Sequence, residues 1–236
     1  MMEKFETVPT WSQQPPGGGG SLTPESRQAR YFCRGPSPDV LRTILDSTVG
    51  LALWQRKLPL SIQQGMSALH VRMPRQCAFH LQPERAATAG LDQALLEFAD
   101  LFPGARDAWR NDLLRLLVLA RSLAPSAGLR IRLETKASEG CSLFHVDNVP
   151  LRLICTYRGA GTQWLPDTAF DRCGLGRGNN DFVHDWSELC QMPTGAVAVL
   201  KGLRFPGQDK LALVHRSPPA DAAFPRVLVA IDINPL

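Results

Sequence analysis

Several common sequence signatures are absent from this chain. None of its six cysteines forms a Cys-x-x-Cys pair, which excludes paired-thiolate zinc sites and dithiol redox motifs. No run of eighteen apolar residues occurs, so the sequence predicts no membrane-spanning helix. Basic residues outnumber acidic ones by only 26 to 22, and no block of five like charges occurs. The charge pattern therefore gives no signal for nucleic acid as a partner.

Signatures of hydrolases and nucleotide-binding proteins are missing as well. Neither a Gly-x-Ser-x-Gly elbow nor a His-Glu-x-x-His helix is present. The glycine-rich residues 174–178 follow no predicted strand and open no helix, which argues against a phosphate-binding loop. The first twenty residues carry acids and lack an apolar core, so they do not form a secretory signal, and we expect a cytoplasmic protein.

Composition divides the chain into a tail and a domain. Residues 1–30 include two adjacent prolines and four consecutive glycines, and they have too little apolar surface to offset the entropy of ordering. We therefore expect 1–30 to be a disordered tail. Residues 31–236 have the length and the apolar content of a single soluble domain.

Residues 31–125 are predicted to be mainly helical. Ser37-Pro38-Asp39 is typical of a helix start, with a capping serine and a proline in the first turn. Residues 91–101 show helical spacing. The strongest pattern covers residues 104–124. Its apolar stripe consists of Trp109, Leu113, Leu116, Leu117 and Ala120.

Residues 126–236 are predicted to be mainly β. The segment 129–134 alternates apolar and charged residues with a period of two, as a half-buried strand does. Further strands are predicted at 151–157, 196–200, 211–214 and 226–233. Helices followed by strands indicate an α+β fold with a C-terminal antiparallel sandwich or barrel.

A possible metal site begins at His145-Val146-Asp147. On a strand, residues i and i+2 point to the same face, so His145 and Asp147 can reach one ion together. His215 ends the apolar segment 211–214 and can supply a third ligand. Two histidines and one carboxylate form the facial triad of non-haem Fe(II) oxygenases, and the same set also binds zinc. A His-x-Asp triplet alone is weak, because chance and structural histidines produce it too.

The segment RLICTYRGAGTQWLP after this triplet strengthens the interpretation. It is similar to the strand and glycine turn of the prolyl-hydroxylase branch of the Fe(II)/2-oxoglutarate dioxygenases, although the turn reads Gly-Ala-Gly and no Arg-x-Ser follows His215. His215 lies 68 residues after Asp147, and Arg226 lies 11 residues after His215, as the second histidine and the basic anchor do in that superfamily. Most of residues 30–236 also resembles an uncharacterised bacterial family, a domain of unknown function that names no activity.

The resemblance implies a fold and a set of roles. The fold would be N-terminal helices packed on an antiparallel double-stranded β-helix, which is jelly-roll-like. His145, Asp147 and His215 would bind Fe(II), and Arg226 would bind 2-oxoglutarate as cosubstrate. Arg152 and Arg216 are alternatives to Arg226, although strand alternation should point Arg216 away from the face of His215.

Three further residues are pocket candidates, namely Tyr157, Thr162 and Trp164. For the two aromatic residues a place in the core is an equally open interpretation, and for Thr162 a role in the turn. No segment marks a peptide groove, a base pocket or a lipid cavity, so the substrate, a small molecule or a peptide, stays open.

Two other functions compete with an Fe(II)- and 2-oxoglutarate-dependent oxygenase. The first is a non-catalytic protein that binds zinc or iron through the same three residues on the same scaffold. The second is a jelly-roll binding module in which the polar triplet is structural. Measuring the binding of Fe(II) and of 2-oxoglutarate would distinguish these three functions.

Overall fold

The computed structural model describes residues 31–69, 75–82, 88–98, 100–136, 142–207, 211–219, 221 and 223–234. The predicted tail, residues 1–30, lies outside the described residues. Among the described residues, no helix is both long enough and apolar enough to cross a membrane.

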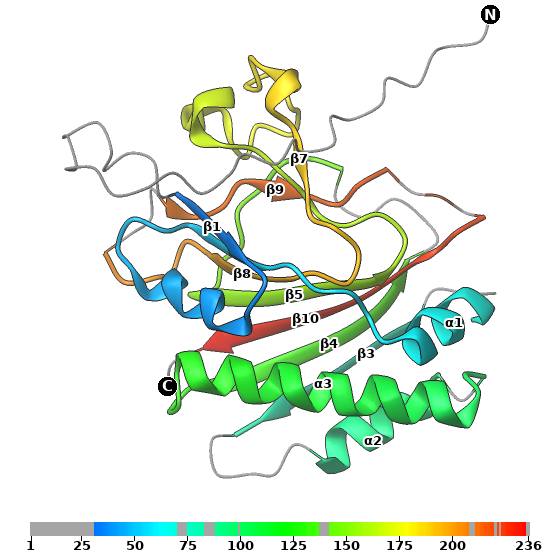
Figure 1. Cartoon of the computed structure of the whole chain (residues 1–236). Helices are drawn as coiled ribbons and strands as arrows, with labels where there is room; N and C mark the ends of the chain where they lie inside the picture. Colours follow the sequence, from blue (N-terminus) through cyan, green and yellow to red (C-terminus); the bar gives the residue numbers. More distant parts are fainter. Residues whose placement is uncertain are drawn as a thin grey trace, which may run out of the picture.

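A seven-stranded sheet forms the centre of the molecule (Figure 1). Its neighbouring strands are antiparallel except for the first two in spatial order, which are parallel. In spatial order the strands are β1 (Phe32–Gly35), β2 (Leu51–Trp54), β8 (Val197–Lys201), β5 (Leu151–Arg158), β10 (Arg226–Asn234), β4 (Gly128–Lys136) and β3 (Arg75–Leu81). Strands far apart in the sequence therefore lie side by side, and the last strand, β10, is paired on both edges.

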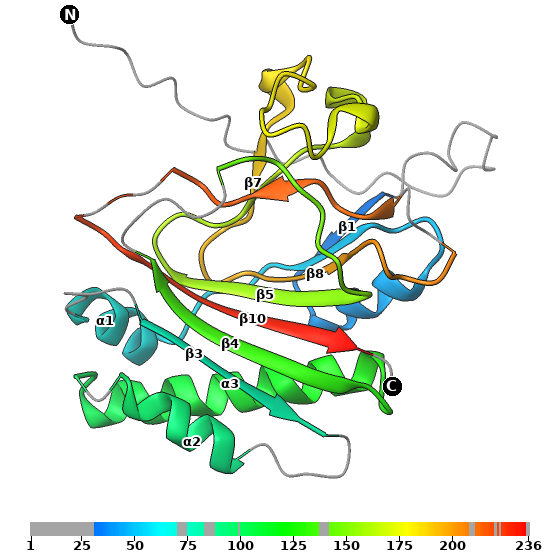
Figure 2. The ribbon, with the colours of Figure 1, turned by 180° about the vertical axis from the view of Figure 1, so that it is seen from behind.

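Helices and a second, smaller sheet cover opposite faces of the large sheet, as Figures 1 and 2 show. The small sheet consists of β7 (Cys190–Gln191), β6 (Gln163–Trp164) and β9 (His215–Arg216). The α-helices are α1 (Leu60–Ala68), α2 (Thr88–Leu96) and α3 (Pro103–Leu123). Short 3₁₀ helices occur at Pro38–Leu45, Asp167–Ala169, Arg172–Gly174 and Trp186–Glu188. The arrangement is a mixed α+β fold.

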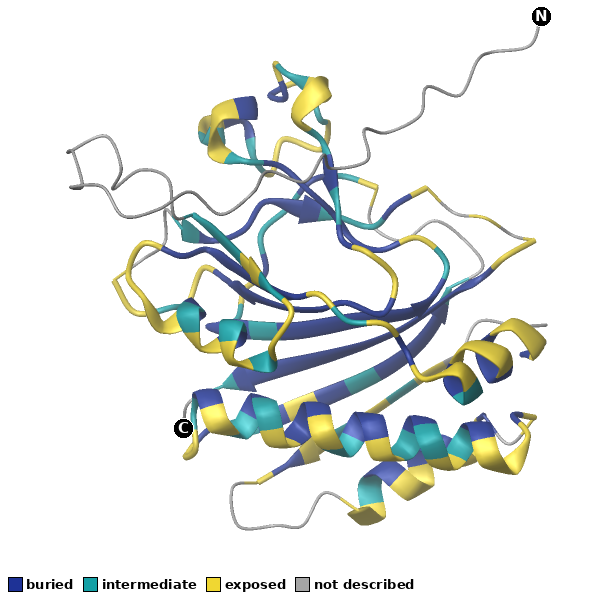
Figure 3. Cartoon of the chain, viewed as in Figure 1, coloured by how far each residue is buried: buried dark blue, intermediate teal, exposed yellow. Residues whose placement is uncertain are grey.

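Strand alternation decides which side chains face the helices. Leu129, Ile131 and Leu133 of β4 are buried in the core against α3, together with the odd-numbered residues of β5 and β10. The even-numbered residues of these strands face the small sheet instead, except Arg158 at the end of β5, which follows a β-bulge. Both faces of the central strands are covered, which is why β5 and β10 are buried almost throughout (Figure 3).

Helix α3 matches its prediction closely. All five residues of its predicted apolar stripe are buried. The ring of Trp109 packs edge-on against Phe98, with centroids 5.0 Å apart, and against Tyr157 of β5 at 5.6 Å. The helix therefore packs on the sheet through the face that the 3.6-residue period predicts.

Two sequence predictions differ from the structure. The predicted N-terminal helices are present, but this half of the chain also supplies β1, β2 and β3 to the large sheet. The predicted strand at 211–214 is wrong, since the strand β9 begins only at His215. The backbone of 211–214 bonds to separate partners instead: Leu213 donates to the carbonyl of Lys201, and the carbonyl of Val214 accepts from Leu165.

Candidate metal centre

His145 and His215 lie directly opposite one another on two extended segments. They form an isolated antiparallel bridge in which each backbone N–H donates to the other's carbonyl, at 2.9 and 3.0 Å. Asp147 follows two residues after His145, so its side chain returns to the same side. Backbone pairing thus brings together residues that are far apart in the sequence.

Both imidazoles have the same orientation. Nδ1 of His145 lies 3.0 Å from the carbonyl oxygen of Leu143, and Nδ1 of His215 lies 3.0 Å from that of Leu213. Each Nδ1 therefore donates to a carbonyl oxygen, which leaves each Nε2 available to a metal ion. Histidines that bind metals are held in this way, by a hydrogen bond from the nitrogen that does not bind the metal.

The free nitrogens converge on Asp147. Nε2 of His215 lies 3.3 Å from Oδ2 of Asp147, and Nε2 of His145 lies 3.9 Å from Oδ1. One ligand atom from each of the three residues lies within 4.8 Å of the others. Metal bonds to nitrogen and oxygen are about 2.0–2.2 Å long, so ligands of one ion lie at such separations.

The charges of this cluster fit a cation. Oδ2 of Asp147 is buried and has no hydrogen-bond partner among the described residues. Burial lowers the pKa of His145, and the neighbouring His215 lowers it further, so the imidazole of His145 is neutral at pH 7. A divalent cation between the two Nε2 atoms and Oδ2 of Asp147 would satisfy all three groups.

Arg152 holds the carboxylate in place. It donates from Nη1 to Oδ1 of Asp147 at 2.5 Å and from Nε to Oδ1 of Asp232 at 2.6 Å. Burial alone would raise the pKa of Asp147, but the contacts with His215 and Arg152 outweigh burial and hold the pKa well below its usual range. Asp147 is therefore ionised, with one oxygen held by Arg152 and the other available to a metal.

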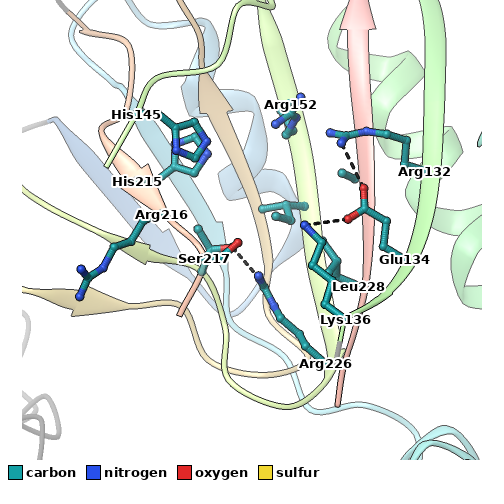
Figure 4. Close-up of a pocket in the computed structure, with 13 residues that line it drawn as sticks. Arg132, Glu134, Lys136, His145, Arg152, His215, Arg216, Ser217, Arg226 and Leu228 are labelled. Carbon is teal, nitrogen blue, oxygen red and sulfur yellow. Dashed lines mark hydrogen bonds and ion pairs between the residues drawn. The ribbon is translucent and has the colours of Figure 1, made fainter. Parts of the chain in front are cut away.

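The cluster opens into a cavity between the two sheets with a volume of about 130 Å³. This volume is well below the roughly 300 Å³ at which pockets for drug-sized molecules begin, so the cavity suits a small ligand. Strands β4, β5 and β10 supply one wall and the small sheet supplies the other (Figure 4). The lining residues are Arg132, Glu134, Lys136, His145, Arg152, Ile154, Thr162, His215, Arg216, Ser217, Arg226, Leu228 and Ala230.

Arg226 is a buried cation in this cavity without a carboxylate partner among the described residues. Its Nη2 donates to two hydroxyls, Oγ1 of Thr156 at 2.9 Å and Oγ1 of Thr162 at 2.7 Å, while its Nε has no partner. Burial lowers the pKa of Arg226 to about 10, with Glu134 opposing the shift. The guanidinium is thus oriented by neutral groups, and an anionic ligand would compensate its charge.

Three of the other cations of the cavity, Arg132, Lys136 and Arg152, are paired with carboxylates. Glu134 accepts from Arg132 at 3.1 Å and from Lys136 at 2.9 Å, while Arg152 is held by the two aspartates. Arg216 donates to Oε1 of Gln163 at 2.8 Å and points away from the two imidazoles, as strand alternation predicts (Figure 4). Of the three arginines considered from the sequence, Arg226 has the geometry of an anion anchor.

The three pocket candidates lie in different places. Thr162 lines the cavity and binds Arg226. Tyr157 instead faces the helices, where its hydroxyl donates to Oδ2 of Asp112 at 2.6 Å. Trp164 packs in the core between the sheets, with its ring centroid 5.1 Å from that of Phe32. Tyr157 and Trp164 therefore do not line the cavity, because their strand positions point them elsewhere.

The charged residues around the triad were not predicted from the sequence. Arg132, Glu134 and Lys136 alternate along β4, and that alternation was visible as the charged half of a period-two strand. The alternation does not show whether the charged face of the strand contacts solvent or, as here, a cavity. The pairing of Asp232 with Arg152 was not predicted either, because Asp232 lies within the apolar run of β10.

Comparison with known families identifies the chain's own family. A family model described as "Protein of unknown function (DUF1826)" matches residues 35–232. The chain belongs to the DUF1826 family. By sequence, no curated protein matches it.

Solved structures resemble this DUF1826 protein in fold. A dioxygenase for auxin oxidation from rice is 15% identical, with 86% of this chain and 82% of that chain covered and a TM-score of 0.51. JOX2 in complex with 2OG, Fe and JA is 11% identical, over 87% and 74% of the chains, at 0.49. A prolyl-4-hydroxylase from Pseudomonas putida is 13% identical, over 85% and 100%, at 0.42. The rice structure shows that this DUF1826 protein shares its fold with a dioxygenase.

Proposed function

We propose that this DUF1826 protein is an oxygenase that depends on Fe(II) and 2-oxoglutarate and is built on a jelly-roll scaffold. One observation carries the proposal. A His-Asp-His cluster opens into the same cavity as the buried Arg226, and among the described residues neither Oδ2 of Asp147 nor the Arg226 charge has a compensating partner. A metal and a small dianion would satisfy these two features together. The shared fold with the rice dioxygenase supports the same function.

Each residue of the cluster has a distinct role in the proposal. His145, Asp147 and His215 would hold the iron, whose redox chemistry allows O₂ to react with the 2-oxo acid. Arg152 positions Asp147 through its short hydrogen bond. The two backbone carbonyls that accept from the histidines fix both rings in the orientation for binding.

Arg226 would bind the carboxylate of 2-oxoglutarate that lies farthest from the metal. A guanidinium offers two parallel donors to a carboxylate, and such charge-assisted pairs are about twice as strong as neutral hydrogen bonds. Thr156 and Thr162 already orient the group by accepting from Nη2. Because Arg226 is buried, the pair would be stronger than one at the surface.

The substrate would approach from the side of His145. The side chain of His145 is 37% exposed, whereas those of His215 and Asp147 are 6% and 7% exposed. The open side of the cluster therefore lies next to this imidazole. A small molecule or an extended peptide can reach the metal there without displacing the cosubstrate at Arg226.

A non-catalytic protein that stores or senses zinc or iron is the alternative. It would use the same three ligands but would gain nothing from Arg226, whose burial without a carboxylate partner among the described residues is costly. The arginine therefore favours the oxygenase. The same reasoning favours iron over zinc, since only a redox-active metal would use a cosubstrate.

Anaerobic titration tests the proposal. Fe(II) and 2-oxoglutarate together should give a weak visible charge-transfer band, and admission of O₂ should then convert 2-oxoglutarate to succinate slowly even without substrate. The variant Asp147→Ala should show neither signal. Tight retention of zinc, with no band and no succinate from the iron-loaded protein, would establish the non-catalytic alternative instead.

A further inference from the structure

A second hollow lies on the opposite side of the large sheet from the metal cavity. It is a groove of about 670 Å³ where α1 lies beside the end of β5 and the start of β10 (Figure 1). The groove and the metal cavity have no lining residue in common. Six residues define its character: Arg56, Lys57, Leu58, Met66, Arg158 and Phe224.

A β-bulge directs Arg158 into this groove. Along β5 and β10, Thr156 pairs with Leu228 but Arg158 pairs with Val227, so Tyr157 is an extra residue on β5. Without the bulge, Arg158 would follow Thr156 toward the metal cavity. The extra residue shifts the alternation, and both Tyr157 and Arg158 line the groove instead.

The groove is cationic. Among the described residues, three cations and no carboxylate line it. Arg56 is neutralised, because its guanidinium forms two hydrogen bonds to Asp112, at 2.5 and 2.7 Å. Lys57 is exposed at the rim, and Arg158 has no carboxylate partner among the described residues.

Arg158 is placed like a binding residue. It is only 8% exposed, its Nη1 donates to the carbonyl of Leu69 at 2.6 Å, and its Nε is buried without a partner in the described part of the chain. Its guanidinium lies over the ring of Phe224, 4.4 Å from the centroid. A guanidinium held flat by an aromatic ring and a carbonyl is oriented in advance, so a ligand oxyanion would bind it with little loss of entropy.

The remaining walls are apolar. Leu58 and Met66 are buried in the core beneath the groove, and Phe224 is 44% exposed at its edge. An apolar chain or ring lying across this edge would remove the exposed ring of Phe224 from water while its charged end reached Arg158. A purely inorganic anion would leave this apolar surface unused.

We propose that the groove is a second binding site, for a small organic oxyanion that combines a carboxylate or phosphate head with an apolar body. Arg158 binds the head by charge-assisted hydrogen bonds, and Lys57 adds a second positive charge at the rim. Leu58, Met66 and Phe224 bind the body. The proposal is independent of the metal centre and of the oxygenase function.

Hexanoate and hexyl phosphate test this site in the full-length protein, with hexanol as the uncharged probe. Calorimetry should show saturable binding of at least one anion and at least tenfold weaker binding of hexanol. The anion with the higher affinity identifies the preferred head group, carboxylate or phosphate. Backbone amide shifts in nuclear magnetic resonance spectra should locate the anion at Gly159 and Met66, beside the groove.

Four variants test which residues bind the anion. Arg158→Met keeps the apolar stem and should weaken binding at least tenfold, and Lys57→Met, at an exposed position that does not endanger folding, should weaken it about threefold. Arg177→Met, a matched change at an exposed arginine, and Arg226→Met, in the metal cavity, should leave binding unchanged. Equal affinity for hexanol, or an affinity that neither Arg158→Met nor Lys57→Met alters, overturns the proposal.

Discussion

Replacement of Arg226 by methionine separates cosubstrate binding from metal binding. Arg226 is 8% exposed, and among the described residues its guanidinium bonds to two threonine hydroxyls. Burial lowers its pKa from the ordinary value of an arginine to about 10. That difference corresponds to about 3 kcal/mol of cost for keeping the charge in the cavity. A bound carboxylate relieves this cost. Loss of the guanidinium should therefore weaken 2-oxoglutarate binding by about 3 kcal/mol, or about 150-fold in Kd.

Anaerobic calorimetry of the Fe(II)-loaded protein measures this change directly. The Kd for 2-oxoglutarate should rise by about two orders of magnitude in Arg226→Met, while Fe(II) affinity, measured without cosubstrate, should stay within a factor of three. Arg216→Met is the matched control, since Arg216 also lines the cavity but donates to Gln163, and it should bind 2-oxoglutarate normally. A change of less than threefold in Arg226→Met would refute the assignment of the anchor.

Three further outcomes are expected. Asp147→Ala should lower Fe(II) affinity by more than about 100-fold, measured by metal content after dialysis, whereas Asp107→Ala on the exposed side of α3 should keep the metal. Asp112→Ala should cost about 3–5 kcal/mol in urea unfolding, because it leaves the buried Arg56 unpaired; a cost below 1 kcal/mol contradicts this. Burial raises the pKa of the Cys155 thiol to about 11, so the unfolded chain deprotonates first, from its ordinary pKa of 9.0. The free energy of unfolding should therefore fall by about 2–3 kcal/mol between pH 9 and 11, and Cys155→Ala should lack that part of the fall.

Features with a clear period were predictable from the sequence. The helix α3 and the strand β4 have a repeating pattern of apolar residues, and β5 and β10 are apolar runs of strand length. The structure contains all four close to their predicted bounds. The strands β1 and β2 have four residues each, too few to establish a period of two. Their position in the sheet depends on pairing with β8 and with one another, which is information that local sequence does not contain.

The convergence of His145, Asp147 and His215 was predictable because strand geometry and chain spacing both constrain these residues. His145 and Asp147 share a face on any extended segment, and the spacing to His215 follows a known superfamily. The orientation of Tyr157 was not predictable, because a period of two has two phases and only the packed helices decide which phase faces them. The bulge beside Tyr157 changes the phase again at Arg158, and only the pairing with β10 shows it.

The charge balance of the metal cavity argues that metal and anion bind together. Five cations around it face three carboxylates: Arg132, Lys136, Arg152, Arg216 and Arg226 against Glu134, Asp147 and Asp232. A divalent ion at the His-Asp-His cluster would add two more positive charges to a site shielded from water, which is costly unless an anion follows. A dicarboxylate would supply two negative charges, one end near the metal and the other near Arg226. The affinity for metal should therefore rise when 2-oxoglutarate is present, and by the same factor the affinity for 2-oxoglutarate should rise when metal is present.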